Sequence, residues 1–169
     1  MLVRIITIFA VFSLFSTMAF AEAKKENCTD ANKYAVCKED VVKQHVIHWC
    51  DRVKKEGDKA FPEMKKFRFN CCGDEQDYVW VNDTRPYMIM HPIKPQLEGK
   101  DLMNFKDPGG KFLFQEFIAS VKKSPDGGWV DYQWTKFGES DPTPKKSWVM
   151  MCKSPKGEEF IVGSGTWAN

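Results

Sequence analysis

The order in which helical and strand patterns follow one another constrains the fold of this chain most. An amphipathic helix is expected first, then two aromatic-rich strands, a long loop that leads into a second helix, and three further strands. The expected elements are a helix over 30–57, strands over 78–82 and 87–91, a loop over 92–110, a helix over 111–123, and strands over 128–136, 146–153 and 158–167. This order is typical of an α+β domain with an antiparallel sheet.

Residue spacing supports both helices. In the first segment Val42, Val46 and Val53 recur at steps of three and four along one face, and in the second segment Phe114 and Phe117 do the same. The strand segments are rich in aromatic and β-branched residues, and turns that contain glycine or proline separate them. The sheet is therefore expected to have about five strands.

The first 21 residues read as a secretory signal peptide. Arg4 precedes an apolar run that ends in the small-residue pattern Ala19-Phe20-Ala21, so we expect cleavage after Ala21. An uncleaved membrane anchor is the alternative. The expected organisation is a signal peptide over 1–21, an N-terminal helical segment over 22–57 and one domain over 58–169. The protein is then periplasmic or secreted, without a membrane span after cleavage.

Charge and motifs exclude several function classes. The net charge is only +2 and the lysines are scattered among acidic residues, so no surface for nucleic acid is expected. The chain has no Gly-x-Ser-x-Gly, no phosphate-binding loop and no His-Glu-x-x-His. We therefore expect neither an enzyme nor a bound cofactor.

Six cysteines stand in a chain that is expected to leave the cytosol. They are Cys28, Cys37, Cys50, Cys71, Cys72 and Cys152. An even number in an oxidising compartment favours disulfides, but six cysteines allow 15 pairings. Our preferred pairing joins the N-terminal helix to the turn that contains Cys71 and Cys72.

Two features leave a different chemistry open. His45 and His48 share a helix face near Cys50, and these three side chains include the ligand types that zinc prefers. The adjacent Cys71 and Cys72 are capable of redox or soft-metal chemistry. We favour the interpretation that the histidines lie at the surface and that the cysteines form structural disulfides.

Seven short segments, in a fixed order, carry a resemblance to a known family. They are His91-Pro92, Gly99-Lys100-Asp101-Leu102, Lys106-Asp107-Pro108-Gly109-Gly110-Lys111, the helix that follows, Gly128-Trp129-Val130-Asp131-Tyr132-Gln133-Trp134, Pro144-Lys145-Lys146-Ser147-Trp148-Val149 and Gly163-Ser164-Gly165. Together they resemble the bacterial extracytoplasmic single Cache sensor domain of type 2. The resemblance implies a PAS-like α+β fold, in which an N-terminal helix packs on a roughly five-stranded antiparallel sheet, and a domain that binds a small molecule.

The resemblance also implies a ligand cavity. Strand alternation puts Tyr132 and Trp134 on one face of their strand, and Lys145 and Ser147 on one face of the next. An ammonium, hydroxyl groups and apolar walls are what a small carboxylate requires. Carried over from the family, the expected ligand-binding residues are Trp80, Tyr87, Met90, His91, Tyr132, Trp134, Lys145 and Ser147. The alternative is that the aromatic residues only fill a core and that Lys145 is solvated.

The sequence thus predicts an exported, free-standing sensor-type protein. It would bind a short organic acid and act with a separate membrane signalling or transport partner. The alternative is a cysteine-rich periplasmic protein of the same fold that binds metal ions or takes part in redox reactions.

Overall fold

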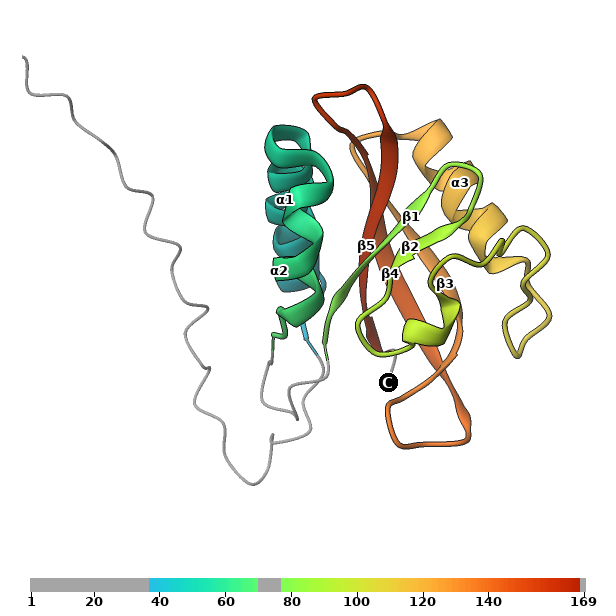
Figure 1. Ribbon diagram of the computed structural model, residues 1–169. Helices are drawn as coiled ribbons and strands as arrows, with labels where there is room; N and C mark the ends of the chain where they lie inside the picture. Colours follow the sequence, from blue (N-terminus) through green and yellow to red (C-terminus); the bar gives the residue numbers. More distant parts are fainter. Residues whose placement is uncertain (1–36, 70–76, 168–169) are drawn as a thin grey trace, which may run out of the picture.

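A five-stranded antiparallel sheet with helices on both faces makes up the part of the chain that the structure describes (Figure 1). The computed structural model describes residues 37–69 and 77–167. The predicted signal peptide, Cys28, Cys71 and Cys72 lie outside these ranges. The helices are α1 (Glu39–Glu56), η1 (Gly57–Ala60), α2 (Phe61–Lys66), η2 (Pro95–Leu97) and α3 (Leu113–Lys123), and the strands are β1 (Val79–Asp83), β2 (Met88–Met90), β3 (Gly128–Thr135), β4 (Pro142–Lys153) and β5 (Glu159–Trp167). The predicted α+β fold class is confirmed.

The last strand in the sequence lies in the middle of the sheet. The strand order is β2-β1-β5-β4-β3, so β5 pairs with β1 on one side and with β4 on the other. Consecutive strands β3, β4 and β5 form a meander, and β1 and β2 form a hairpin at the far edge. Side chains from β1, β4 and β5 can therefore meet over the centre of the sheet.

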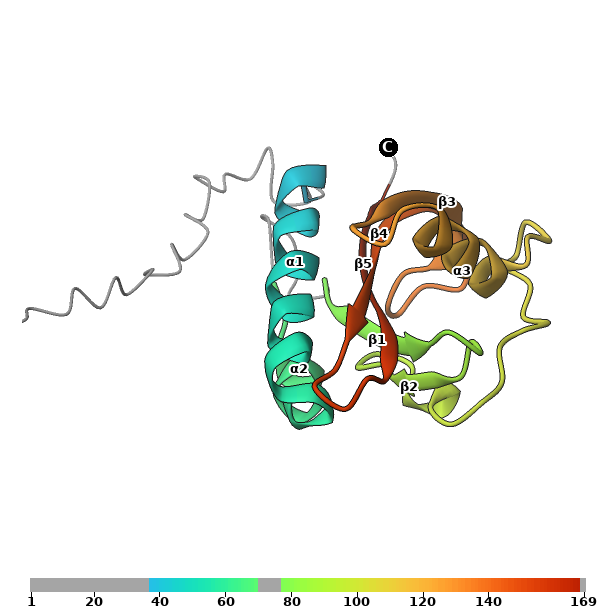
Figure 2. The same ribbon diagram turned by 90° about the horizontal axis from the view of Figure 1, so that it is seen from above.

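Each face of the sheet carries its own apolar layer. Helices α1 and α2 cover one face, and α3 covers the other (Figure 2). Val46, Trp49 and Val53 of α1 pack with Val162 on the first face. On the opposite face the buried side of α3 presents Leu113, Phe114, Phe117, Ile118 and Val121, as the spacing of these residues predicts.

A register shift in the β1–β2 hairpin changes which methionine faces which layer. Val81 is opposite Met90, but the next residue, Asn82, is opposite Met88, so Ile89 is an extra residue in β2. Such a bulge interrupts the usual alternation of side chains. Met88 consequently packs on the α3 side and Met90 on the α1 side.

A disulfide joins α1 to the sheet. Cys50 and Cys152 are bonded with a sulfur–sulfur distance of 2.03 Å across 102 residues of sequence, and both are buried. Sequence reasoning did not select this pair. Cys37 is also disulfide-bonded, and no cysteine in the described ranges is free. The preferred bridge to Cys71 and Cys72 falls on residues outside those ranges.

Candidate functional site

A small internal cavity lies between the sheet and α3. Its walls come from β1 and the residue before it, from β2 and the residue after it, from α3 and from β3. The lining residues are Tyr78, Trp80, Met88, His91, Leu113, Phe114, Phe117, Tyr132 and Trp134. The space open to the centre of a water molecule is about 10 Å³, which is close to the smallest volume that holds one water.

One polar atom of the cavity wall has no partner. Trp80 is 3% exposed, and its indole Nε1 is buried without a hydrogen-bond acceptor. A buried donor without a partner costs about 1–3 kcal/mol. A ligand or water that accepts a hydrogen bond from Trp80 Nε1 would recover part of this free energy.

Lys145 is a buried ammonium beside the cavity. Its side chain is 3% exposed, and its Nζ lies 4.8 Å from the centre of the Tyr78 ring and 4.4 Å from that of Trp167. No residue in the described ranges accepts a hydrogen bond from this Nζ. Burial lowers the pKa of Lys145 to about 8, although the nearby Asp77 carboxylate acts in the opposite direction. Asp77 is itself buried, and desolvation raises its pKa to about 6.

Two hydroxyl groups form a pair next to Lys145. Tyr132 is the cross-strand neighbour of Lys145, and its hydroxyl lies 2.9 Å from Ser147 Oγ. Both side chains are buried, and desolvation raises the pKa of Tyr132 well above its ordinary value. Tyr132 therefore stays neutral, so that the pair can donate and accept hydrogen bonds but carries no charge.

His91 is held as a neutral ring. Its Nδ1 accepts hydrogen bonds from the backbone N–H groups of Lys94 at 3.0 Å and Ile93 at 3.3 Å. The proton of the neutral imidazole must then be on Nε2. Burial, reinforced by the positive charges of Lys145 and Lys94, lowers the pKa of His91 to about 3. His91 can offer one N–H donor over a wide pH range.

Two glycines of β5 make the room that these side chains occupy. A Cβ on Gly163 would lie 2.4 Å from the Trp80 ring, and a Cβ on Gly165 would lie 2.1 Å from Ser147 Oγ and 2.8 Å from Lys145 Cε. No side chain can stand at either position without displacing these groups. The Gly-Ser-Gly segment therefore shapes the centre of the site.

The structure brings most of the expected site residues together. Trp80, His91, Tyr132 and Trp134 line the cavity, and Lys145 and Ser147 lie beside it, as described above. Tyr87 is 38% exposed and lies under the Arg85 guanidinium, away from the cavity lining.

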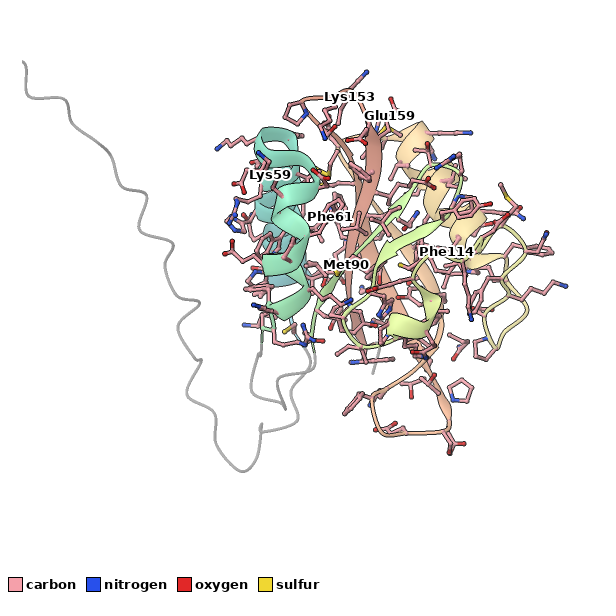
Figure 3. All side chains as sticks on the ribbon, viewed as in Figure 1. Lys59, Phe61, Met90, Phe114, Lys153 and Glu159 are labelled. Carbon is pink, nitrogen blue, oxygen red and sulfur yellow. A yellow bond between two sulfur atoms is a disulfide. The ribbon has the colours of Figure 1, made fainter. Side chains whose placement is uncertain are left out.

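Met90, one of the expected site residues, does not line this cavity. Met90 packs with the α1 layer and Phe114 with the α3 layer, on opposite sides of the sheet (Figure 3). The bulge at Ile89 is the cause, because it turns Met88 toward the cavity in place of Met90.

Several wall residues were missed by sequence reasoning. Tyr78, Leu113, Phe114 and Phe117 line the cavity, and their apolar periodicity only indicated a core. A signal was available for Tyr78, since it has the same strand parity as Trp80.

The histidine and cysteine group on α1 does not form a metal site in the described part of the chain. Cys50 is bonded to Cys152, so its thiolate is not available as a ligand. The His45 ring lies tilted against the Phe69 ring, with 4.2 Å between the ring centres, and burial lowers the pKa of His45 to about 4. Within the described ranges no group of three His, Cys, Asp or Glu side chains is arranged to hold a metal ion.

The sequence of residues 52–168 matches the family model of the single Cache domain 2. The chain belongs to this family. The chain is also similar to the methyl-accepting chemotaxis protein McpP of Pseudomonas putida, which is 42% identical over 96 residues, or 57% of this chain. The matched region spans only 17% of the length of McpP.

Solved structures of chemotaxis proteins and sensor domains share the fold. One is a Cache chemosensory domain described for its recognition of carboxylic acids, 35% identical with a TM-score of 0.61 over 77% of this chain and 90% of that one. A periplasmic sensor domain of a chemotaxis protein is 37% identical, with a TM-score of 0.59 over 77% and 88% of the two chains. A chemotaxis protein from Vibrio parahaemolyticus, 22% identical with a TM-score of 0.62 over 76% and 86%, supports the fold alone.

These findings make the protein a Cache sensor domain, homologous to the ligand-binding domains of chemotaxis receptors. Domains of this kind bind ligands. The described residues contain no helix of the length and hydropathy needed to cross a bilayer.

Proposed function

We propose that this Cache domain binds a short organic carboxylate in the cavity beneath α3, and that it has no catalytic activity. The observation that carries the proposal is the buried Lys145 ammonium, for which no described residue supplies a hydrogen-bond acceptor. A buried charge is stable only when it is paired. A carboxylate would complete the pairing that the two aromatic rings and Asp77 provide only in part.

The neighbouring groups suit the same ligand. The Tyr132–Ser147 pair supplies neutral hydroxyl groups, and the Trp80 and His91 N–H groups can donate to oxygen. The remaining walls are apolar rings and aliphatic side chains, which exclude water. The cavity has room for about one water molecule, which is less than any organic acid occupies, so binding requires wall side chains to move outward.

The wider role follows by analogy with the receptors to which the chain is similar. We propose that the domain acts outside the cytoplasm, in the periplasm or secreted, and that it passes ligand binding to a membrane signalling or transport partner. Two observations support this role: the predicted signal peptide over 1–21 and the relatedness to chemotaxis receptors. Nothing in the described residues favours the metal or redox alternative.

Replacement of the charge and of the hydroxyl group tests the binding site. Lys145→Met keeps most of the apolar stem and removes the ammonium, and Tyr132→Phe removes only the hydroxyl. A hydrogen bond to a charged group contributes roughly 1.5–3 kcal/mol, so Lys145→Met should weaken carboxylate binding about ten- to a hundredfold. Isothermal titration calorimetry with acetate, propionate, lactate and pyruvate measures this effect.

Lys146→Met is the matched control. Lys146 is the next residue of β4, points to the opposite face and forms an ion pair with Glu39. This variant should bind the best acid as tightly as the parent. If Lys145→Met and Tyr132→Phe also bind that acid like the parent, the cavity is not the carboxylate site.

A further inference from the structure

An open groove runs along the edge strand β3, where α3 packs on the sheet. Its walls are the outer side of α3 and the first half of β3, and its volume is about 580 Å³. The groove and the cavity beneath α3 have no described lining residue in common. The groove is therefore a separate surface of the domain.

The first half of β3 presents unpaired backbone groups at this edge. β3 has only β4 as a neighbour in the sheet. The Asp131 carbonyl and the Gln133 N–H point away from β4, because Lys111 Nζ donates to the first and the second donates to Asp107. Strand alternation points the N–H and C=O of Trp129 in the same direction, and no described residue forms a hydrogen bond with either group. Such groups are a template for pairing with another strand.

The side of α3 that lines the groove is complementary to itself. Glu116 and Lys123 are both exposed, stand seven residues apart and have no ion-pair partner in the described part of the chain. The small residues Ala119 and Ser120 lie midway between them on the same side. If two of these helices pack antiparallel about an axis at Ala119 and Ser120, Glu116 of each copy faces Lys123 of the other. A twofold interface requires a surface that pairs with itself in this way.

The strand and the helix place the twofold axis at the same point. A Cβ on Gly128 would lie 2.4 Å from Ser120 Oγ, so the middle of the helix face lies next to Gly128 and Trp129. A twofold axis at Trp129 pairs its N–H and C=O with those of a second copy in an antiparallel ladder. Val130 of one copy then stands opposite Gly128 of the other, which has no side chain to obstruct it.

We propose that the groove between α3 and β3 binds a second copy of this chain. The two β3 strands pair antiparallel at Trp129, and the two α3 helices pack across the axis with reciprocal ion pairs between Glu116 and Lys123. An added peptide strand would satisfy only the backbone of Trp129 and would leave both charges unpaired, whereas a second copy satisfies all of these groups. The proposal does not depend on the carboxylate site.

Charge reversal on α3 tests the interface. The parent protein should show a monomer–dimer equilibrium in sedimentation velocity experiments at increasing protein concentration. Glu116→Lys and Lys123→Glu each place like charges opposite each other at two symmetric contacts, so each variant should raise the dissociation constant of the dimer about tenfold or more. A mixture of the two variants should associate again, because one carries only positive and the other only negative charges on this face.

Two further measurements complete the test. Lys122→Glu is the matched control, because it makes the same charge change on the same helix at an exposed residue that does not line the groove, and it should dimerise like the parent. The backbone amide proton of Trp129 should exchange with solvent more slowly in the parent dimer than in monomeric Glu116→Lys, since strand pairing protects it.

Three results would overturn the proposal. The first is a parent protein that stays monomeric at every concentration measured. The second is a dimer that Glu116→Lys and Lys123→Glu leave as tight as the parent, or a mixture of these variants that does not associate, because the interface would then lie elsewhere. The third is equal exchange of the Trp129 amide proton in dimer and monomer, which would show that the β3 strands do not pair.

Discussion

Lys145 is enclosed by the rings of Tyr78 and Trp167, and burial lowers the pKa of its ammonium to about 8. The other groups around it titrate elsewhere or carry no charge near neutral pH. Asp77, with a pKa of about 6, is ionised above neutrality, and His91, with a pKa of about 3, is uncharged. Lys94 also lies near, and desolvation lowers its pKa. The charge that attracts a carboxylate is therefore lost on the alkaline side.

This arrangement predicts that carboxylate affinity falls above pH 8. The ligand requires the charged form of Lys145, and that form decreases as pH rises through about 8. Between pH 7 and pH 9 the binding-competent fraction, and with it the affinity, should fall about tenfold. Calorimetric titration at both pH values measures the change.

The same titration on two variants shows which lysine causes the loss of affinity at high pH. Lys94→Met should keep the pH dependence, and Lys145→Met should bind weakly and equally at both pH values. If the parent protein binds the carboxylate with equal affinity at pH 7 and pH 9, Lys145 is not the positive charge that pairs with the ligand.

Sequence alone located about half of the cavity wall, for reasons that particular residues make clear. Tyr132 and Trp134 follow from strand alternation in β3, which the structure keeps without interruption. Met90 was expected in the cavity, and Met88 lines it instead, because a one-residue bulge leaves no mark in the local sequence. Phe114 and Phe117 could only be assigned to a core, since apolar periodicity does not distinguish a cavity wall from a packed interior.

At the scale of the element, β5 combines a structural and a functional constraint. It is the central strand and is buried along nearly its whole length. At Gly163 and Gly165, the two positions over which Trp80 and Lys145 lie, it has no side chain. Glycine in a strand interior weakens the strand. The close approach of Trp80 and Lys145 to the backbone of β5 is the physical reason for this composition.

Gly165→Ala should therefore damage both stability and the site. The added Cβ would lie 2.1 Å from Ser147 Oγ and 2.7 Å from the backbone oxygen of Lys146, and the backbone cannot move away easily. Overpacking of this kind lowers the free energy of unfolding by about 1–3 kcal/mol, which urea denaturation measures. Gly109→Ala is the control, because the nearest atom to its Cβ is the flexible Gln133 Cγ at 3.3 Å. A Gly165→Ala protein as stable as the parent would contradict the close packing described for β5.

The edge strand β3 is covered by the loop that leads into α3. Asp107 accepts a hydrogen bond from the backbone N–H of Gln133 at 2.8 Å and another from that of Lys111 at 2.7 Å, while Lys111 Nζ donates to the Asp131 carbonyl. An uncovered edge invites pairing with another chain. These contacts give the Lys-Asp-Pro-Gly-Gly-Lys turn a structural role, since it covers β3 and fixes the start of α3.

At the scale of the whole molecule, the sheet separates two layers with different tasks. The α3 layer contains the cavity, the unpartnered Trp80 Nε1 and the buried lysine. The α1 layer is packed with apolar side chains and closed by the Cys50–Cys152 disulfide. The sequence predicted an N-terminal helix packed on a five-stranded sheet, but it did not predict which face α3 covers. It did not predict the disulfide pairing either, because pairing depends on which helix turn lies opposite which strand position.

Removal of the Cys50–Cys152 disulfide should separate stability from binding. The bond closes a loop of 102 residues, and loss of such a constraint lowers the free energy of unfolding by about 2–5 kcal/mol. The bond lies in the α1 layer, on the opposite face of the sheet from the cavity. The double variant Cys50→Ala, Cys152→Ala should therefore unfold at lower urea concentration and yet bind the best carboxylate within about twofold of the parent. Urea denaturation and calorimetry on the same preparation measure both quantities.

Loss of carboxylate affinity in a variant that remains folded would contradict this separation. It would mean that the two layers are coupled through the sheet, and that the position of α1 responds to the ligand.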